Sequence, residues 1–247
     1  MGRVDDLSMF RGPNVAVDIA VLTVVPAPLS GTGLSQLAVL VEQPDFVADG
    51  TVLPGRFLRE GQTVAQAVAD ALHVKAGLVG LDVLPRLLRV FDDPGRDPRG
   101  WTLSLGHAVS VAFEHLEGAR GQLAHVDGQG AADAGSPLLF DHDVIVREAA
   151  EGMRARYELE PDPDGLFGVG FTLAELRDLH EGVLGQQLRK DTFNRRMVEQ
   201  LRPQTRSDGT PVLRTRGGRP AQVYLRQPRP GVPPASRRRL VLPRETN

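Results

Sequence analysis

Several features that many proteins have are missing from this sequence of 247 residues. It contains no cysteine, which excludes disulfides, thiolate metal sites and cysteine nucleophiles. It has no run of 18 apolar residues, so we expect no membrane span. Its first residues carry no apolar stretch followed by a small-residue cleavage site, so we expect no secretory signal. These absences predict a soluble protein of the cytoplasm.

The sequence also lacks the signatures of several enzyme classes. Its six histidines are scattered without a His-Glu-x-x-His run, and neither a Gly-x-Ser-x-Gly nor a P-loop pattern occurs. His142 lies in Asp141-His142-Asp143 at the predicted start of a helix, which is more typical of capping than of catalysis. We therefore predict no catalytic residue, no metal site and no cofactor.

A net charge of −2 conceals an uneven distribution of charge along the chain. Residues 1–170 carry 13 Lys and Arg against 24 Asp and Glu, whereas residues 171–247 carry 16 against 7. An acidic body with a basic final third indicates that only the final third meets a polyanion. The alternative is an arginine-rich solvated tail.

Alternating helix and strand signals fill the first two thirds of the chain. Apolar, β-branched runs predict strands over 15–25, 36–42, 83–91 and 101–114. A helix is predicted over 63–76, and another from an N-cap at Asp141 to about Tyr157. The Gly- and Ala-rich stretch 116–136 shows no apolar period and is predicted to be an irregular loop.

One segment carries a motif. Residues 55–78 read GRFLREGQTVAQAVADALHVKAGL, which resembles the Nudix box, a loop–helix–loop that holds Mg²⁺ against a diphosphate with helix carboxylates. The spacing of the box survives but its chemistry does not, because other residues stand at its opening Gly, first Glu, Arg-Glu pair and Glu-Glu pair: Arg56, Gln62, Asp70, Ala71, Val74 and Lys75. A lysine at a ligand position opposes metal binding. Metal-dependent hydrolysis is therefore not expected.

A second segment supports this resemblance. Residues 91–100, Phe-Asp-Asp-Pro-Gly-Arg-Asp-Pro-Arg-Gly, closely resemble a segment of Nudix proteins related to ADP-ribose pyrophosphatases, and of the Nudix-related transcriptional regulators of NAD metabolism. The resemblance to these regulators extends over most of residues 15–226. It implies an α+β chain: a Nudix-like α/β/α sandwich with a mixed sheet, followed by a winged helix-turn-helix domain.

The resemblance also implies a ligand, ADP-ribose or a related NAD-derived nucleotide, which is sensed rather than cleaved. Arginines can bind a diphosphate without a metal, and we expect Arg56, Arg59 and Arg99 to contact phosphate or ribose. Phe91 or Trp101 is expected to stack on the adenine. For Phe91, a place in the core of the strand is an equal alternative.

The final third predicts DNA binding from its own residues. Thr172 and Glu175 form a capping-box pattern, and helices are predicted over 173–184 and 190–201 with a Gly in the turn between them, the spacing of a helix–turn–helix. Phe193, Met197 and Leu201 form an apolar stripe. The other side of the second helix is expected to contact base edges and phosphates through Lys190, Thr192, Asn194, Arg195 and Arg196.

A basic hairpin follows these helices. Val212-Leu213-Arg214 and residues 222–225 are predicted to pair around a Gly-Gly turn, so that three arginines reach phosphate or a minor groove: Arg214, Arg216 and Arg219. Beyond Gln227 the sequence is rich in Pro and Arg and predicts a disordered tail. In the resembled family, the same helix openings and Gly-Gly-Arg-Pro wing are typical.

These observations predict four parts: a sensor domain over 1–157, a linker over 158–170, a winged helix over 171–226, and a tail over 227–247. We expect a homodimer that binds double-stranded operator DNA as a regulator, most simply a repressor, and responds to a nucleotide. Two alternatives remain open: a Nudix hydrolase with non-standard metal ligands, and an interaction protein whose basic domain binds RNA or protein. Scarce aromatic residues in 171–226 argue against RNA stacking.

Overall fold

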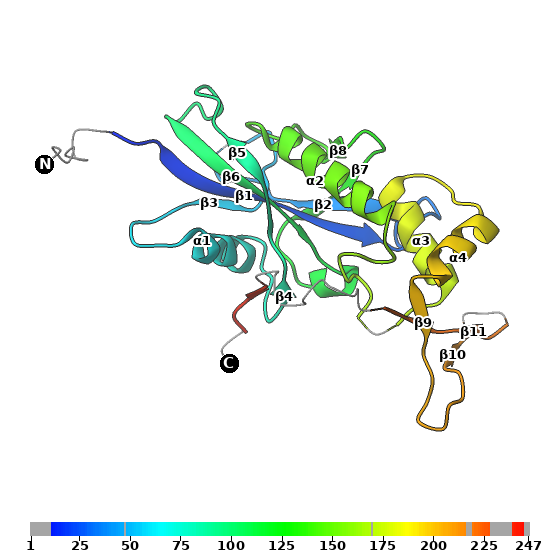
Figure 1. Cartoon of the computed structure of the whole chain (residues 1–247). Helices are drawn as coiled ribbons and strands as arrows, with labels where there is room; N and C mark the ends of the chain where they lie inside the picture. Colours follow the sequence, from blue (N-terminus) through cyan, green and yellow to red (C-terminus); the bar gives the residue numbers. More distant parts are fainter. Residues whose placement is uncertain (1–10, 47, 169, 216–218, 228–238, 245–247) are drawn as a thin grey trace, which may run out of the picture.

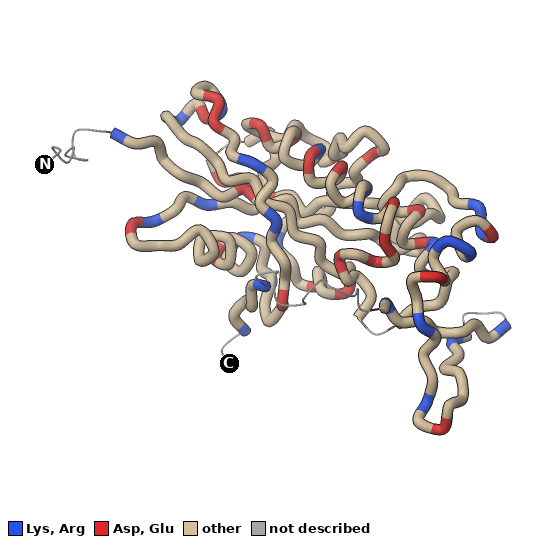
Figure 2. Tube along the Cα trace, viewed as in Figure 1, with Lys and Arg blue, Asp and Glu red and all other residues tan. Residues whose placement is uncertain are grey.

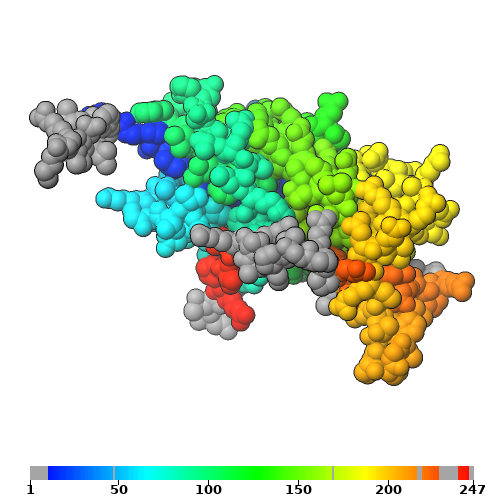
Figure 3. Space-filling view, in the orientation of Figure 1, coloured from blue at the N-terminus to red at the C-terminus, as the bar shows by residue number. Residues whose placement is uncertain are grey.

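The computed structural model describes residues 11–46, 48–168, 170–215, 219–227 and 239–244. A twisted sheet forms the centre of the larger lobe, with a helix on one face and two helices on the other (Figure 1). A smaller lobe with a projecting hairpin follows at one end (Figure 3). No helix of the described residues is long and apolar enough to cross a membrane.

The sheet is built around β1 (Asn14–Val25), whose residues from Ala16 to Val24 are all buried. This strand pairs in parallel with β6 (Thr102–Ser110) and antiparallel with β2 (Gln36–Val41) and β3 (Gly55–Phe57). The outer strands are β5 (Arg86–Phe91), β7 (Gln122–Val126) and β8 (Ala132–Asp133), and the order is β5-β6-β1-β2-β7-β8. A strand covered on both faces reads as a continuous apolar run, which is why β1 was predictable.

Two apolar layers cover the faces of this sheet. On one face lie α1 (Val64–Asp70) and the π-helical turn Ala71–Lys75 that continues it. On the other face lie α2 (His142–Tyr157) and α3 (Leu173–Leu184). A short 3₁₀ turn, Phe113–Leu116, follows β6. The predicted α/β/α sandwich with a mixed sheet is confirmed.

The prediction of a loop over 116–136 is wrong for Gln122–Val126 and Ala132–Asp133, which are strands. Strand β7 pairs with β2 from Gln122 to Val126, and β8 pairs with the end of β7. Ala124 and Val126 alternate toward the core, a two-residue period that the surrounding Gly and Ala residues conceal. Backbone pairing with β2 supplies the stability that the small side chains do not.

The smaller lobe contains the expected helix pair and hairpin. The predicted capping box is present, since the Thr172 hydroxyl accepts from the Glu175 amide and the Glu175 carboxylate accepts from the Thr172 amide. The second helix, α4 (Lys190–Val198), ends three residues earlier than predicted because Leu201 begins a strand. The strands are β9 (Leu201–Pro203), β10 (Leu213–Arg214), β11 (Ala221–Gln222) and β12 (Tyr224–Arg226), paired as β9–β12 and β10–β11.

The two lobes are joined through α3. Leu179 and Val183 of this helix belong to the apolar core of the sheet, whereas Leu176 belongs to the core of the smaller lobe with Phe193. At Gly182, an added Cβ would lie 2.7 Å from a methyl of Val24, so the close contact of α3 with the sheet depends on glycine. The smaller lobe is therefore held directly on the sensor fold.

Residues 158–168, where a linker was predicted, are packed between the lobes. Asp162 is fully buried, and its backbone adopts a left-handed conformation with φ of +46°. Its carboxylate accepts from the amides of Leu166 and Phe167 and from the Tyr157 hydroxyl. Asp tolerates this left-handed backbone better than most residues, and its hydrogen bonds fix the turn.

The prediction of a disordered tail is wrong for Arg239–Arg244. Strand β13 (Leu240–Val241) pairs with β4 (Asp82–Val83) beside α1. Leu242 is 1% exposed and belongs to the core on the α1 side of the sheet. Leu240 and Leu242 supply apolar side chains at strand spacing, and this short pattern is hidden in a Pro- and Arg-rich sequence.

A buried histidine at the lobe junction should make stability depend on pH. His180 lies between the rings of Tyr157 and Phe193, with centroids 5.0 and 5.1 Å away. Burial, with the nearby charge of Arg196, lowers the pKa of His180 to about 4. Below pH 6.5 this histidine is protonated in the unfolded chain but stays neutral in the folded chain until about pH 4. The free energy of unfolding should therefore decrease as the pH is lowered from 6.5 to 4, by on the order of 3 kcal/mol. His180→Leu should flatten this fall in urea titrations, and an unchanged slope would contradict the assignment.

Candidate functional site

A cavity of about 550 Å³ opens between β1, β3, the box helix and the loops before β6 and α2. Its volume falls within the usual range of ligand pockets, about 300–1,000 Å³. Five cationic side chains contribute to its lining: Arg56, Arg59, Lys75, Arg96 and Arg99. Four carboxylates line it as well, Asp18, Glu42, Asp45 and Asp97, so the lining carries charges of both signs with a small positive excess.

The floor of this pocket is a buried ionic cluster centred on Arg96. Its guanidinium is 3% exposed and binds both Asp141, through two nitrogens, and Asp18, at 3.2 Å. Nε2 of His142 lies 3.5 Å from Asp18, while Nδ1 accepts from the amide of Leu53 at 2.9 Å. Burial alone would raise the pKa of Asp18, but His142, Ser104 and Arg96 together hold it well below its usual range. Asp18 therefore stays ionised, and the cluster joins β1, the loop before β6 and α2.

Asp141 does not act as predicted. It occupies the N-cap position of α2, but its side chain makes no capping hydrogen bond because the carboxylate binds Arg96 instead. His142, expected to belong to a capping arrangement, is buried in the pocket floor.

An aromatic group surrounds Arg99 at the mouth of the pocket. The guanidinium carbon lies 4.7 Å from the ring centre of Phe46, 5.0 Å from that of Phe140 and 5.6 Å from that of Phe57. Asp97 holds the guanidinium in place by hydrogen bonds of 2.9 and 2.8 Å. Phe46 and Phe57 are exposed, so they offer apolar ring surface at the entrance.

The carboxylate on α1, the helix of the Nudix-like box, is already paired with neighbouring side chains. Its one carboxylate, Asp70, lies 3.0 Å from Nη1 of Arg56 and accepts from the Gln62 amide at 2.8 Å. Among the described residues, no group of three or more His, Cys, Asp or Glu side chains is arranged to hold a metal ion. A guanidinium and Lys75 beside this helix supply positive charge, so the residues present do not fit Mg²⁺.

Of the five residues predicted to bind a ligand, only the three arginines line this pocket. Arg56, Arg59 and Arg99 line this pocket. Phe91 is 2% exposed, lies in the apolar core and packs on Gly106, so its ring is inaccessible for stacking and the core alternative holds. Trp101 is 57% exposed and does not line the pocket.

The smaller lobe gathers basic side chains on α4 and the hairpin (Figure 2). Phe193 and Met197 are buried in its core, as the apolar stripe predicted. The other side of α4 presents exposed Lys190, Thr192, Arg195 and Arg196, with Asn194 half-buried. This is the face that a recognition helix needs.

The predicted wing arginines have different surroundings. Arg214 pairs with the buried carboxylate of Glu175 at 2.7 Å, which ties the hairpin to the start of α3 and makes this arginine partly structural. Arg219 is exposed, and Arg216 lies outside the described residues.

Comparisons with known proteins agree with this architecture. No family model matches the chain. An Acinetobacter baylyi protein described as an ADPR responsive transcriptional repressor NtrR is 26% identical over 88% of this chain and 83% of its own length. The crystal structure of Shewanella oneidensis NrtR with a 27mer DNA matches with a TM-score of 0.64 and 24% identity, covering 86% of this chain and 93% of that chain. The chain has the fold of a Nudix-related regulator. The predicted resemblance and the predicted winged helix are thereby confirmed.

Two further proteins are similar to all or part of the chain. A MutT/nudix family protein of Enterococcus faecalis has the same fold, with a TM-score of 0.64, 20% identity, and 89% and 90% coverage. An ADP-ribose pyrophosphatase of Methanocaldococcus jannaschii is 33% identical over 101 residues, or 39% of this chain and 54% of its own length.

The most important pocket residues were missed from the sequence. Arg96, Asp97 and Arg99 lie in one quoted motif, yet only Arg99 was selected, although Arg96 is the buried member. Asp18 lies within an apolar strand, where a charged residue is itself a signal of a paired partner. Phe46 and Phe140 lie in loops with no pattern to single them out.

Removing the central cation should destabilise the sensor strongly. In Arg96→Met, the carboxylates of Asp18 and Asp141 lose their shared partner while still largely buried. Breaking a buried ion pair on one side costs about 3–5 kcal/mol, and we expect a loss of this size in chemical denaturation. Arg147→Met is the matched control, because the exposed Arg147–Asp143 pair should contribute about 0.5 kcal/mol or less. Equal effects of the two substitutions would contradict the structural role of Arg96.

Proposed function

We propose that this protein is a DNA-binding transcriptional regulator, in the simplest case a repressor, whose Nudix-like pocket senses ADP-ribose or a related nucleotide. This proposal rests on two features that occur in the same chain. One is a pocket beside a box helix whose carboxylate is already paired, and the other is a winged helix with an exposed basic face. The related Acinetobacter baylyi protein is described as an ADPR responsive repressor, and the Shewanella oneidensis protein of the same fold was crystallised with DNA.

The DNA contact is assigned to α4 and the wing. Lys190, Thr192, Asn194, Arg195 and Arg196 lie on or beside the exposed face of α4, and Arg and Asn side chains pair well with guanine and adenine edges. Arg219 on the hairpin is placed to contact phosphate, and Arg216 is assigned the same role from the sequence alone. Arg214 contributes charge to the wing while fixing it to Glu175.

Replacing two recognition-helix arginines should abolish specific DNA binding without unfolding the lobe. Arg195 and Arg196 are exposed, so Arg195→Ala with Arg196→Ala removes base and phosphate contacts but no core packing. Removing a single base contact costs about 1–3 kcal/mol, which predicts at least a tenfold drop in operator affinity for the double variant. Electrophoretic shifts on the upstream region of its own gene measure this, with Arg147→Ala on α2 as a control that removes an exposed arginine outside the smaller lobe. Unchanged operator binding would reject α4 as the recognition helix.

The effector is assigned to the pocket beneath β3. Arg56, Arg59 and Arg99 offer guanidinium groups to a diphosphate, and the exposed rings of Phe46 and Phe57 offer stacking surface for a base. The stacking role moves to these rings from Phe91 and Trp101. To regulate DNA binding, the nucleotide must favour one arrangement of the lobes over another.

We propose further that the chain is not a hydrolase. The kinship to an ADP-ribose pyrophosphatase makes hydrolysis the second candidate function. Against it stands the box helix, whose Asp70 is engaged by Arg56 and Gln62 and whose last ligand position is Lys75. In hydrolases a divalent ion neutralises the diphosphate. Here the guanidinium of Arg56 supplies positive charge at the same helix.

Effector binding should therefore need no metal. ADP-ribose should bind equally in EDTA and in Mg²⁺ by calorimetry, and no AMP should form on prolonged incubation with Mg²⁺. Arg56→Gln should weaken binding at least tenfold, since one charged hydrogen bond is worth about 1.5–3 kcal/mol. Binding that requires Mg²⁺, or steady release of AMP, would favour the hydrolase.

We also infer the organisation around these sites. The sensor is assigned to residues 1–157 and the winged helix to 171–226, with 158–170 between them. The regulator is proposed to be a homodimer in the cytoplasm that presents two recognition helices to a two-fold-symmetric operator.

A further inference from the structure

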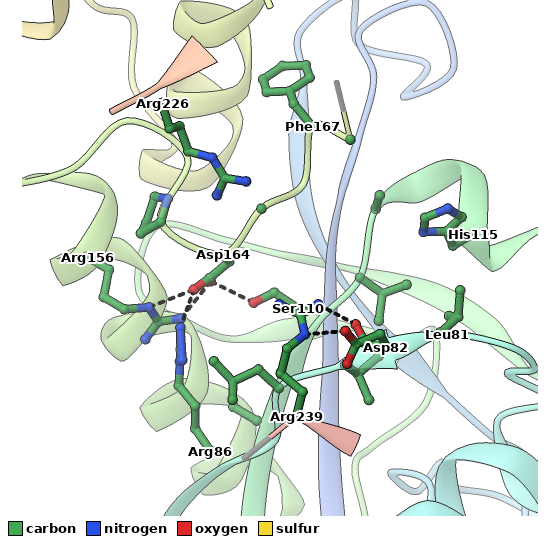
Figure 4. A pocket seen from close by; sticks show the side chains of 18 residues that line it. Leu81, Asp82, Arg86, Ser110, His115, Arg156, Asp164, Phe167, Arg226 and Arg239 are labelled. Carbon is green, nitrogen blue, oxygen red and sulfur yellow. Dashed lines mark hydrogen bonds and ion pairs between the residues drawn. The ribbon is translucent and has the colours of Figure 1, made fainter. Parts of the chain in front are cut away.

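A second cavity, of about 410 Å³, lies at the junction of the lobes (Figure 4), and it shares no lining residue with the sensor pocket. Its wall is assembled from segments far apart in the sequence. Four arginines reach it from β5, α2, β12 and the residue before β13: Arg86, Arg156, Arg226 and Arg239. Convergence of four guanidinium groups calls for a compensating anion.

Two of these arginines share one carboxylate. Asp164, 2% exposed, lies 2.7 Å from Arg86 and within 3.0 Å of two nitrogens of Arg156, and it accepts from the Ser110 hydroxyl at 2.7 Å. Burial would raise the pKa of Asp164, but Arg156, Ser110 and Arg86 lower it, so the carboxylate stays charged. One negative charge therefore faces two positive ones.

The third arginine is not closely neutralised. Nη1 of Arg226 donates to the carbonyl oxygen of Asp162 at 2.8 Å, whereas the Asp162 carboxylate is 3.8 Å away. That carboxylate is engaged by the backbone amides of Leu166 and Phe167. Arg226 is 42% exposed, and its guanidinium points toward the cavity (Figure 4).

The fourth arginine closes the opposite side. Arg239 binds the carboxylate and the carbonyl oxygen of Asp82, and this pair is about half exposed. Four guanidinium groups thus line the cavity with the carboxylates of Asp82 and Asp164, and the carboxylate of Asp162, behind the lining, lies 3.8 Å from Arg226. The surplus is positive and lies in a recess, where it is less screened than on an open surface.

We propose that this cavity is a second ligand site, distinct from the sensor pocket, and that it binds a small phosphate monoester. A guanidinium fork matches the oxygens of a phosphate, which can accept hydrogen bonds from several guanidinium groups at once. Leu81, Leu84 and Phe167 add apolar surface beside the arginines, where the carbon body of the ligand would lie.

The position of the site gives it a consequence for regulation. Arg226 belongs to β12 of the smaller lobe, whereas Arg86 and Arg156 belong to the sensor. A phosphate that touches both sides links the wing to the sensor sheet, and it shifts the lobes only as far as it binds one arrangement better.

The test is calorimetry on the full chain with ribose 5-phosphate, using ribose and inorganic phosphate as comparison ligands. We expect saturable binding of ribose 5-phosphate and none of ribose. Arg226→Gln should weaken binding at least tenfold, and Arg147→Gln on the exposed side of α2 should leave it unchanged. ADP-ribose should bind Arg226→Gln as it binds the parent chain. If Arg226→Gln folds poorly, Arg239→Gln, in a half-exposed pair, replaces it with the same expectation.

Several results would overturn the proposal: no binding of ribose 5-phosphate, binding indifferent to both substitutions, or displacement of ribose 5-phosphate by ADP-ribose competing for one pocket. Equal binding of inorganic phosphate would support the site and identify free phosphate as a ligand. These measurements need no DNA. A failure of operator binding would therefore reject the proposed regulatory function but would leave the proposal of a second ligand site unaffected.

Discussion

The guanidinium of Arg96 is the interaction on which the sensor depends. It is nearly inaccessible to water and is held by Asp18 from the central strand and Asp141 from the start of α2. A buried cation of this kind is tolerated only when its partners are fixed. The cluster therefore sets the position of the 92–101 loop, and with it the place of Arg99 and the aromatic rings at the pocket mouth.

The box helix also differs from that of a Nudix hydrolase in the pairing of its carboxylate. In a Nudix hydrolase the helix carboxylates are left unpaired so that a metal can bridge them to the substrate. Here Asp70 already has a guanidinium and an amide as partners. The loop–helix–loop of the box is retained, while neutral residues and Lys75 stand at the positions of its metal-binding carboxylates.

Elements with a strong local signal were predictable from the sequence: the apolar run of β1, the Thr172–Glu175 capping box, and the buried stripe of Phe193 and Met197. The failures involve contacts between distant residues. Arg96 meets Asp18 across 78 residues, a contact that depends on the parallel pairing of β1 with β6. Strand β7 and strand β13 have short, weakly apolar sequences, so their structure comes from the partner strand rather than from their own propensity.

Strand β13 has a consequence for how the molecule is made. Leu242 fills part of the core beneath the sheet, yet it follows the winged helix in the chain. During synthesis, residues 171–226 therefore emerge before the larger lobe has received Leu242. The core of the larger lobe is completed by a segment that follows the smaller lobe in the chain, so the larger lobe cannot finish folding before the smaller one has been made.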